Sequence, residues 1–337
     1  MMRYLESGST DPYFNLALEQ YIFDSLPRDQ SYFMLWQNDN TIVVGKHQNT
    51  FAEINADYVR DHSVRVARRL SGGGVVYHDL GNINFTFITD YTGENFDFAF
   101  FCRPVLRALT ALGVPAALSG RNDMTIQGKK FSGNSQYIKQ GRVMHHGTLM
   151  FDSNLDILEE ALRVSPDKIR SKGIQSVRSR VTNICPYLDR PMTAQTFFAH
   201  LLNFMTTEFG LTPVFLASED LGRVRQLRDG RYATWVWNYG ESPAYQLEKR
   251  RRVEGCGEIQ VHMDVDGGVI QAIAFYGDYF SSRDPAQLAK MLAGTRLEER
   301  SLRQRLSQVN LEAFFHGITL RAFCDLLLSS QAEAPST

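Results

Sequence analysis

The sequence has little cysteine and no cysteine pairs. Its 337 residues include four cysteines, which lie far apart and form no CxxC pair. This spacing argues against a disulfide framework or a zinc knuckle, and free thiols fit a reducing compartment. The N-terminus lacks an apolar signal segment, and no later stretch approaches 18 uninterrupted apolar residues. We therefore expect a cytoplasmic protein that does not contact the membrane. The cysteines are Cys102, Cys185, Cys256 and Cys324.

An excess of charge of either sign is also missing. Lysine and arginine number 36 and aspartate and glutamate 37, so the net charge is -1. A dedicated nucleic-acid-binding protein would carry a basic excess, so we expect no nucleic-acid partner. Hydrophobic residues make up 43% of the chain and charged residues 22%, which is typical of a globular protein with a substantial core. The length favours two domains.

Regular strand–helix–strand alternation is the third feature that the sequence lacks, which disfavours a doubly wound parallel sheet. Asp11 followed by Pro12 predicts a helix start, with the aspartate as N-cap. Short alternating runs bounded by turn residues predict many strands. We therefore expect an α+β fold with largely antiparallel or mixed sheets and flanking helices. Strands are predicted at residues 32–36, 41–44, 64–70, 75–78, 83–89, 124–127, 130–138 and 143–151, and further helices at 97–112, 154–162 and 193–209.

A domain boundary is predicted near residues 240–252. Residues 240–243 read Gly-Glu-Ser-Pro, a turn-rich stretch. Residues 249–252 are a run of four basic residues that we interpret as a solvated linker in preference to a contact with an acidic acceptor domain. The expected division is a first domain at residues 1–245 and a small α+β C-terminal domain at 246–337. The second domain should contain one hairpin, at residues 252–265 and 269–276, followed by helices.

The most informative motif is the segment 68–79, which reads RRLSGGGVVYHD. Three consecutive glycines between two strands let backbone N–H groups approach a ligand closely, including an anion. Arg69 offers a planar donor for a phosphate or carboxylate. Taken alone, the segment is more consistent with a flexible hairpin and a solvated arginine pair. It is not a P-loop, because the GxxxxGK[ST] pattern is absent.

Two further segments bear on chemistry. Residues 120–134 contain Asp123, which suits a metal ion or a ribose, and Lys130, which suits a phosphate or a carboxylate. Taken alone, the segment is more consistent with a polar hairpin turn and two solvated lysines. The neighbouring Lys129 should face the other side of the strand. His145 and His146 are neighbours in a predicted strand and so cannot easily chelate one ion together. We expect one histidine to lie beside a ligand and the other to be packed away.

The polar, basic segment 172–183 is the last of these motifs. It reads KGIQSVRSRVTN and lacks clear periodicity. Such a segment fits a mobile loop that closes over a phosphate-bearing ligand, or an ordinary solvated loop.

Together, and in this order, the motifs resemble those of the lipoate–protein ligases. The resemblance rests on the glycine segment, Gly-Arg-Asn-Asp at 120–123, Lys-x-Ser-Gly from Lys130, His-His-Gly-Thr-Leu at 145–149 and the segment 173–183. It extends to DPYFNLA at 11–17 and WVWNYG at 235–240, and so covers essentially the whole chain. It implies the fold of the biotin/lipoate ligase catalytic domain with a small accessory domain.

The resemblance implies a two-step reaction. Lipoate and ATP form lipoyl-adenylate with release of pyrophosphate, and the lipoyl group then passes to a lysine of an acceptor domain. The implied acceptors are E2 subunits of 2-oxoacid dehydrogenases or the glycine-cleavage H protein. Lys130 matches the family's central catalytic lysine, and Asp123 matches a position near Mg²⁺ and the phosphates. The other residues implied to bind lipoate or the adenylate are Arg69, Ser71, Gly73, Gly74, His78, Asn82, Ser132, His146, Thr148, Arg178 and Arg180.

The lipoyl tail is apolar and needs an apolar slot. Trp36, Val43 and Val76 are candidates from their placement in predicted strands. Two other functions stay open. One is an ATP-independent lipoyl or octanoyl amidotransferase of the same fold, which would need a pocket cysteine. The other is a non-catalytic protein that only binds lipoate or a carrier domain. The sequence does not rank lipoate against octanoate.

Overall fold

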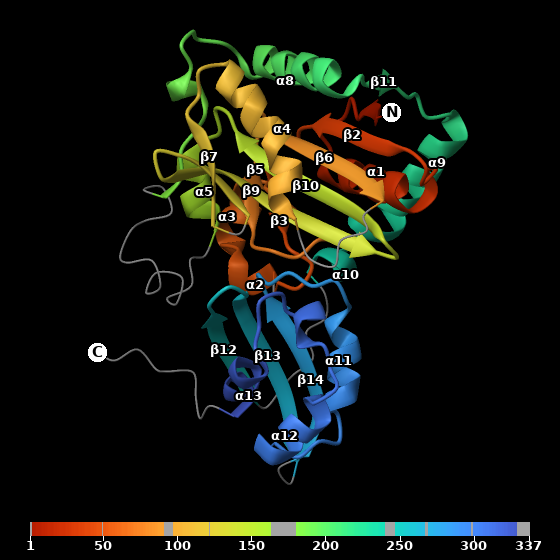
Figure 1. Cartoon of the computed structure of the whole chain (residues 1–337), viewed down its shortest axis with the longest axis vertical. Helices are drawn as coiled ribbons and strands as arrows, with labels where there is room; N and C mark the ends of the chain where they lie inside the picture. Colours follow the sequence, from red (N-terminus) through yellow and green to blue (C-terminus); the bar gives the residue numbers. More distant parts are fainter. Residues whose placement is uncertain are drawn as a thin grey trace.

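The structure is a computed structural model that describes residues 2–48, 50–90, 97–120, 122–162, 180–239, 247–266, 269–297 and 299–328. It has a larger body, formed by the described residues before 240, and a smaller body formed by residues 247–328 (Figure 1). The smaller body has its own apolar core of residues from its three strands and its helices. The predicted boundary at 245/246 falls among residues 240–246, outside the described residues, and stays a prediction.

An eight-stranded mixed sheet forms the frame of the larger body, in the order β11-β1-β2-β6-β10-β9-β8-β7. β1 pairs in parallel with β2 and with β11, and the pairs from β2 to β7 are antiparallel. The α+β prediction is therefore confirmed, with a mixed sheet. The strands are β1 (Met2–Glu6), β2 (Ser31–Trp36), β6 (Asn82–Asp90), β7 (Ala116–Ser119), β8 (Asp123–Ile126), β9 (Lys129–Lys139), β10 (Arg142–Met150) and β11 (Thr212–Pro213).

A second, three-stranded sheet has the order β4-β3-β5. Its strands are β3 (Thr41–Val44), β4 (Arg65–Arg68) and β5 (Val76–His78). The predicted strands at 32–36 and 41–44 both exist, but they belong to different sheets. Between them the chain turns through Asn40, which has a left-handed φ of 41°. Because the chain crosses over here, the two sheets can lie on opposite sides of a pocket.

The helices begin where capping chemistry favours it. Asp11 accepts a hydrogen bond from the Tyr13 N–H, and Asp97 accepts one from the Phe100 N–H. The predicted helices at 12, 97–112, 154–162 and 193–209 are all present. The larger body contains α1 (Pro12–Ser25), α2 (Thr50–Glu53), α3 (Ala56–Asp61), α4 (Phe98–Ala111), α5 (Leu155–Ala161), η1 (Cys185–Tyr187), α8 (Ala194–Phe209), α9 (Ser218–Leu227), η2 (Arg228–Tyr232) and α10 (Trp235–Asn238).

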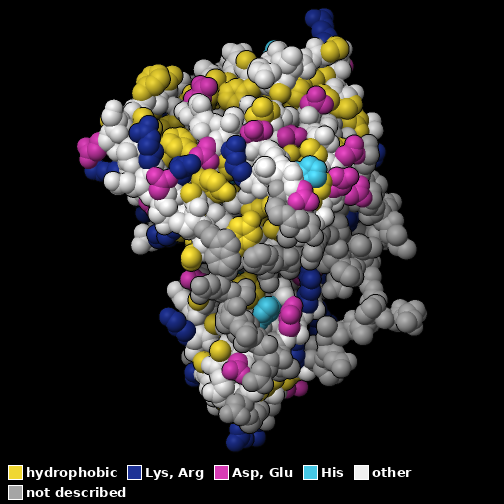
Figure 2. Space-filling model, turned by 180° about the vertical axis from the view of Figure 1, so that it is seen from behind, with side chains coloured by type: hydrophobic (Ala, Val, Ile, Leu, Met, Phe, Trp, Pro, Cys, Tyr) yellow, Lys and Arg dark blue, Asp and Glu magenta, His cyan; other side chains and the backbone are white. Residues whose placement is uncertain are grey.

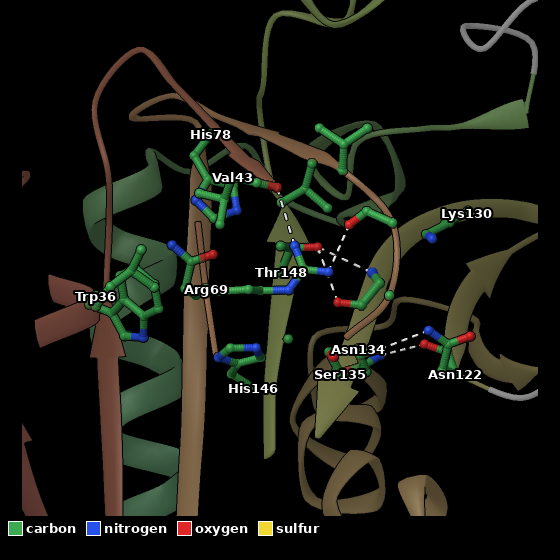
Figure 3. A pocket seen from close by; sticks show the side chains of 18 residues that line it. Trp36, Val43, Arg69, His78, Asn122, Lys130, Asn134, Ser135, His146 and Thr148 are labelled. Carbon is green, nitrogen blue, oxygen red and sulfur yellow. Dashed lines mark hydrogen bonds between the residues drawn. The ribbon is translucent and has the colours of Figure 1, made fainter. Parts of the chain in front are cut away.

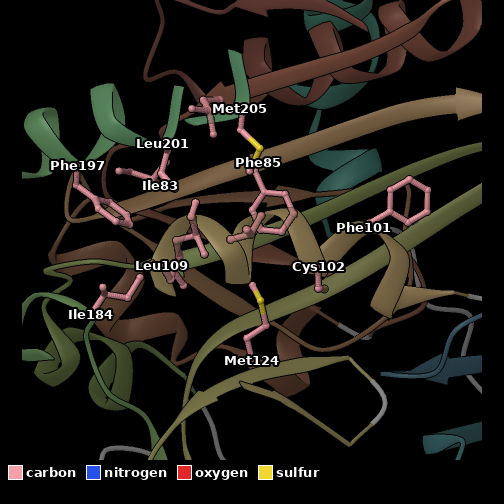
Figure 4. Close-up of a cluster of buried hydrophobic side chains, with 14 of the residues drawn as sticks. Ile83, Phe85, Phe101, Cys102, Leu109, Met124, Ile184, Phe197, Leu201 and Met205 are labelled. Atoms are coloured by element: carbon pink, nitrogen blue, oxygen red, sulfur yellow. The ribbon is translucent and has the colours of Figure 1, made fainter. Parts of the chain in front are cut away.

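The main core lies between one face of the large sheet and helices α4 and α8 (Figure 4). Phe85 and Leu109 are fully buried there, as are Phe197 and Leu201 on α8. The opposite face of the same sheet packs partly against α1. Because one face of the sheet is filled by this core, the other face is available for a pocket.

The smaller body corrects the prediction for residues 249–252. These basic residues do not form a linker: they lie in β12, the first strand of a three-stranded antiparallel sheet. Lys249 is buried and donates to the Leu327 carbonyl, and Arg250 pairs with Glu258 at 2.6 Å. The predicted single hairpin is therefore a three-stranded sheet. Its elements are β12 (Leu247–Val253), β13 (Gly257–Asp266), β14 (Val269–Gly277), α11 (Pro285–Leu292), α12 (Glu299–Leu306), η3 (Leu311–Ala313) and α13 (Leu320–Leu328).

The surface carries both signs of charge. In the view from behind, lysine and arginine side chains occur together with aspartate and glutamate side chains on the larger body (Figure 2). This mixture agrees with the balanced composition. Within the described residues, no helix is long and apolar enough to cross a membrane.

Candidate active site

A narrow pocket of about 90 Å³ lies between the large sheet and the small sheet (Figure 3). It gathers residues from six strands, the glycine segment and α1, which are far apart in the sequence. The residues that line it are Leu16, Trp36, Val43, Arg69, Gly73, Gly74, Val75, Val76, His78, Asn84, Asn122, Lys130, Gly133, Asn134, Ser135, His146, Gly147 and Thr148.

The floor of the pocket follows from the register of the large sheet. Asn84 on β6 pairs with Trp36 on β2 and with Thr148 on β10, so these three side chains form a row on one face. The Gly133 N–H donates to the Thr148 hydroxyl at 3.1 Å, which continues the row to β9. Three strand spacings of about 4.8 Å separate β2 from β9, or about 14 Å in all. The floor is therefore long enough for an extended, slender ligand.

The roof comes from the small sheet and the glycine segment. Val43 on β3 pairs with Val76 on β5. Gly73 has a φ of 88°, which favours glycine. A Cβ at Gly45 would collide with the Gly73 carbonyl. The absence of side chains at these turns lets the backbone close over the pocket.

Arg69 holds the glycine segment in place. Its guanidinium donates to the carbonyls of Val43, Gly72 and Gly74, and its Nε donates to the Ser71 hydroxyl. The side chain is almost completely buried, and burial lowers its pKa to about 10, so it stays charged at neutral pH. Arg69 lines the pocket as predicted, but most of its hydrogen-bonding capacity is used within the protein.

Lys130 lies at the β9 end of the pocket and forms an ion pair with Asp123, with Nζ 2.8 Å from Oδ1. Both side chains are partly exposed, at 38% and 29%. Lys129 is exposed and does not line the pocket, as the strand alternation predicts. The Lys130 carbonyl accepts a hydrogen bond from the Thr182 N–H at 2.9 Å. The end of the predicted lid segment therefore lies against the lysine strand.

His146 faces the pocket and joins a buried hydrogen-bond chain. Its Nε2 lies 2.6 Å from the Ser71 hydroxyl, and its Nδ1 lies 3.0 Å from Glu19 on α1. This chain connects the floor to the glycine segment. His145 points to the opposite face, where it stacks on Phe101 in the core. One histidine therefore lines the pocket and the other is packed away.

His78 lies at the end of the pocket away from Lys130. Its ring is edge-on to Trp36, with the ring centroids 6.3 Å apart. Leu16, Val43 and Val76 line the same pocket. Burial lowers the pKa of His78 to about 3, and the nearby Arg69 adds to the shift. The resemblance assigns His78 to the adenylate, whereas its contact with Trp36 places it among the predicted tail residues.

The other predicted site residues lie beside the pocket. Ser71, Asn82 and Ser132 are buried next to lining residues. Asp123 reaches the pocket through its ion pair with Lys130. Arg180 is half-buried and precedes by two residues Thr182, whose N–H donates to the Lys130 carbonyl. Arg178 lies outside the described residues. The lining residues that the sequence reasoning missed are Leu16, Val75, Asn84, Asn122, Gly133, Asn134, Ser135 and Gly147.

One signal for the missed floor residues is visible in the sequence. Asn82, Asn84 and Thr86 alternate with Ile83 and Phe85 on β6, a central strand. Polar residues at every second position of a buried strand indicate a polar interior face. Asn122 and Asn134 carried no such signal, because they meet through side-chain bonds to each other's backbone carbonyls (Figure 3).

The cysteines bear on the amidotransferase alternative. None of the four lines the pocket. Burial raises the pKa of the Cys102 thiol to about 12, and burial with a hydrogen bond to Asp152 raises that of Cys185 to about 11. Cys256 and Cys324 belong to the core of the smaller body. The structure therefore offers no activated pocket thiol among its cysteines.

A magnesium ion would find a sparse set of protein ligands. The described residues contain no cluster of three or more histidine, cysteine, aspartate or glutamate side chains suited to a metal. Asp123 is a half-exposed carboxylate at the Lys130 end. One carboxylate together with substrate phosphates and water is a common environment for Mg²⁺ in nucleotide sites, so Asp123 fits that kind of ion.

Comparison with known proteins identifies the family of the chain. Residues 11–206 match the model described as "Lipoyl protein ligase A/B catalytic domain", and residues 242–327 match "Bacterial lipoate protein ligase C-terminus". The chain is 44% identical over 321 residues to the lipoate-protein ligase LplJ of Bacillus subtilis, covering 94% of this chain and 97% of that protein.

Two solved structures share the fold. One is LipL1 of P. falciparum in complex with lipoate, with a TM-score of 0.77 at 22% identity, covering 97% of this chain and 99% of that chain. The other is a lipoate-protein ligase A bound with ATP, with a TM-score of 0.59 at 24% identity, covering 71% and 98%. At these identities the structural similarity establishes the fold. The match to LipL1, which covers 97% of this chain, includes the expected accessory domain.

Proposed function

The chain belongs to the lipoyl protein ligase A/B family, and we propose that the pocket between its two sheets is where lipoate is activated with ATP and passed to an acceptor lysine. One observation carries this assignment to the pocket. A slender slot has a half-exposed lysine at one end and the enclosed residues Trp36 and Val43 at the other. That arrangement suits a molecule with a carboxylate head and an apolar tail.

In the first step, a carboxylate oxygen of lipoate attacks the α-phosphorus of ATP. The bond from that phosphorus to the bridging oxygen breaks, and pyrophosphate leaves with the electron pair. In the second step, the acceptor lysine nitrogen attacks the acyl carbon and loses a proton, and AMP leaves with the electrons of the acyl–oxygen bond. In both steps the protein must hold two reactants together and stabilise negative charge. It does not need to form a covalent bond to the substrate.

Lys130 supplies the fixed positive charge. Its ammonium lies at the entrance of the slot, where the carboxylate of a bound lipoate would meet the α-phosphate. The ion pair with Asp123 orients it without enclosing it. In this scheme, Lys130 attracts both anions in the first step and stabilises the acyl oxygen in the second.

Asp123 is the residue that would hold Mg²⁺. The ion would offset the charge of the ATP phosphates during attack. The roof supplies the rest of the adenylate contacts: Gly73 and Gly74 present bare backbone there, held by Arg69 and Ser71. We assign Thr148, His146 and Ser132 to the floor of the same site, and Asn82, Arg178 and Arg180 to the adenylate as the resemblance implies.

The direct test is lipoate-dependent exchange of radiolabelled pyrophosphate into ATP, which reports the first step alone. The ligase should catalyse exchange with lipoate and Mg²⁺ and none without lipoate. An amidotransferase or a simple binding protein would show no exchange. Transfer of the lipoyl group to isolated carrier domains, followed by mass spectrometry, then tests the second step.

The acceptor and the location are finer proposals. We propose that the acceptors are the lipoyl domains of 2-oxoacid dehydrogenase E2 subunits or the glycine-cleavage H protein, following the resemblance. We also propose a cytoplasmic location, which rests on the four free cysteines. Assay of a panel of carrier domains ranks the acceptors, and cell fractionation tests the location.

A further inference from the structure

The imidazole of His78 contains a buried nitrogen that has no partner. The Nδ1 atom lies 3.1 Å from the side-chain nitrogen of Asn38, whereas Nε2 has no hydrogen bond and is closed to solvent. His78 is 3% exposed and lines the pocket. A buried polar atom without a partner costs free energy, so a native structure that keeps one calls for an explanation.

A network behind the ring fixes the orientation of Asn38. The side-chain nitrogen of Asn15 donates to the carbonyls of Ser9 and Gln37 at 3.0 and 2.8 Å, and it lies 2.9 Å from Asn38 Oδ1. Because two backbone carbonyls identify the Asn15 nitrogen, Asn38 must present its oxygen to Asn15. Asn38 therefore presents its NH₂ group to His78.

This orientation determines which nitrogen of His78 carries the proton. Asn38 donates to Nδ1, so Nδ1 is the acceptor and a neutral ring carries its hydrogen on Nε2. Burial keeps the ring neutral, since the pKa of His78 is lowered to about 3. The unpartnered atom is therefore a hydrogen-bond donor, an N–H group.

The ring that carries this donor lines the enclosed end of the pocket. His78 is edge-on to Trp36, and Trp36 lies three strands away from the lysine strand. Asn84, next to Trp36 in register, also has a side-chain nitrogen without a partner. The tail end of the pocket is thus not purely apolar, although the prediction from the sequence was an apolar slot.

We propose that the Nε2–H of His78 donates to a dithiolane sulfur of lipoate, and that this contact makes the enzyme prefer lipoate to octanoate. The proposal rests on the proposed function and deepens it by naming the part of the substrate that the enzyme recognises, the dithiolane sulfur. Asn38 and Asn15 act as positioning residues, because they set the tautomer of His78 without touching the substrate.

The physical basis is the cost of an unpaired donor. Divalent sulfur is a weak acceptor, so a dithiolane gives the N–H group a partner. Octanoate fills the same slot with hydrocarbon and leaves the donor unpaired in a dry site. Discrimination arises from this difference, and a weak acceptor limits it to about five- to tenfold in kcat/KM.

The test measures the ratio of kcat/KM for lipoate to that for octanoate in the pyrophosphate exchange assay. His78→Phe keeps a ring but removes the donor, and it should lower the ratio about five- to tenfold. His78→Gln is the matched control, because its amide nitrogen reaches the position of Nε2, and it should keep the ratio within about twofold of the wild type. Equal ratios in the wild type and His78→Phe would overturn the proposal.

Asn38→Asp tests the positioning role with almost no change in volume. A carboxylate accepts from Nδ1, which moves the hydrogen off Nε2. The ¹⁵N shifts of the His78 ring, assigned by comparison with His78→Gln, report the tautomer directly. The ratio must follow the tautomer: a shift to Nδ1–H should lower it as His78→Phe does, and an unchanged tautomer should leave it unchanged. A ratio that does not track the tautomer contradicts the proposal.

Two results distinguish failure of the proposed function from failure of the role of His78. If the wild type shows no lipoate-dependent exchange, the proposed function fails. If exchange is normal but the ratio is the same in all four proteins, only the role of His78 fails. Isothermal titration calorimetry of lipoate and octanoate without ATP measures the ratio of their dissociation constants for a His78 variant that binds but turns over too slowly.

Discussion

At one end of the pocket Lys130 and Asp123 form a charged and partly exposed pair, whereas at the other end the side chains around Trp36 are buried. Lys130 and Asp123 keep 38% and 29% of their side-chain surface in solvent. Trp36, Val43 and His78 keep less than 5%. An exposed end can admit a nucleotide and an acceptor lysine, and an enclosed end can discriminate between one carboxylic acid substrate and another. The difference supports our proposal that chemistry and substrate selection are separated along the slot.

The largest expected effect is at the charged end. Lys130→Ala should lower lipoate-dependent pyrophosphate exchange at least about 100-fold, because it removes the charge that stabilises the reacting oxygens. Lys129→Ala is the matched control, since that side chain is exposed and outside the pocket. It should retain exchange near the wild-type rate. The opposite result, with Lys129 essential and Lys130 dispensable, would contradict the assignment of the chemical steps to the Lys130 end of the pocket.

Asp123→Asn should lower exchange about 10- to 100-fold and raise the Mg²⁺ concentration needed for half-maximal rate. The amide keeps the size of the side chain but loses its charge, so it weakens both the ion pair with Lys130 and any metal contact. Titration of Mg²⁺ separates the two effects. An unchanged Mg²⁺ requirement with lower kcat would restrict Asp123 to orienting the lysine.

The enclosed end should respond differently. Trp36→Ala should raise the KM for lipoate about tenfold through lost apolar contact while leaving the KM for ATP nearly unchanged. Steady-state exchange kinetics with each substrate varied in turn measures both values. A variant whose main defect is the KM for ATP would place the nucleotide, rather than the tail, against Trp36.

Three buried histidines predict a pH dependence of stability. Burial lowers the pKa of His78 to about 3 and those of His47 and His145 well below 6.5. Below pH 6.5 these histidines bind protons in the unfolded chain but stay neutral in the native protein. The free energy of unfolding therefore falls as pH drops from about 6.5 toward 3. Each histidine contributes at most about 1.4 kcal/mol per pH unit.

Denaturant unfolding followed between pH 7 and 4 measures this slope. His78→Phe should reduce the slope by the share of one histidine, even if it lowers stability at neutral pH. A wild-type unfolding midpoint that stays constant over this range would show that these histidines are not held neutral by burial.

The smallest expected effect concerns the roof. The Gly73 N–H donates to the Tyr279 carbonyl of the smaller body at 3.2 Å, and a Cβ at Gly72 would collide with that carbonyl. Gly72→Ala should therefore cost about 1–2 kcal/mol of stability by pushing the two bodies apart. Gly222→Ala on α9 is the control, because open space surrounds it and alanine favours a helix. Equal thermal midpoints for the two variants would argue against a tight contact.

Much of the fold was predictable because its signals are local. Asp11 and Asp97 cap helices at the predicted starts, and the alternating strands lie within a residue or two of their predicted bounds at most positions. Pairing between distant segments was not predictable. The parallel contacts of β1, and the separation of β2 and β3 into two sheets, depend on chain paths that no local pattern encodes.

The candidate site was likewise predictable only in part. The motif residues Arg69, Lys130, His146 and Thr148 line one pocket, and their order along the chain was visible in the sequence. The run at 249–252 was interpreted wrongly, because a strand can bury the stems of basic side chains and pair their charges. The surroundings of His78 were also hidden, since Asn15 and Asn38 act on it only after folding.

The most direct test of the two-ended pocket is a crystal structure of the protein with lipoate, with the sulfur atoms located by anomalous scattering. We predict both sulfur peaks at the enclosed end, beside Trp36 and His78, and the carboxylate within hydrogen-bonding distance of Lys130 Nζ. Sulfur peaks beside Lys130, with the carboxylate toward Trp36, would contradict the account.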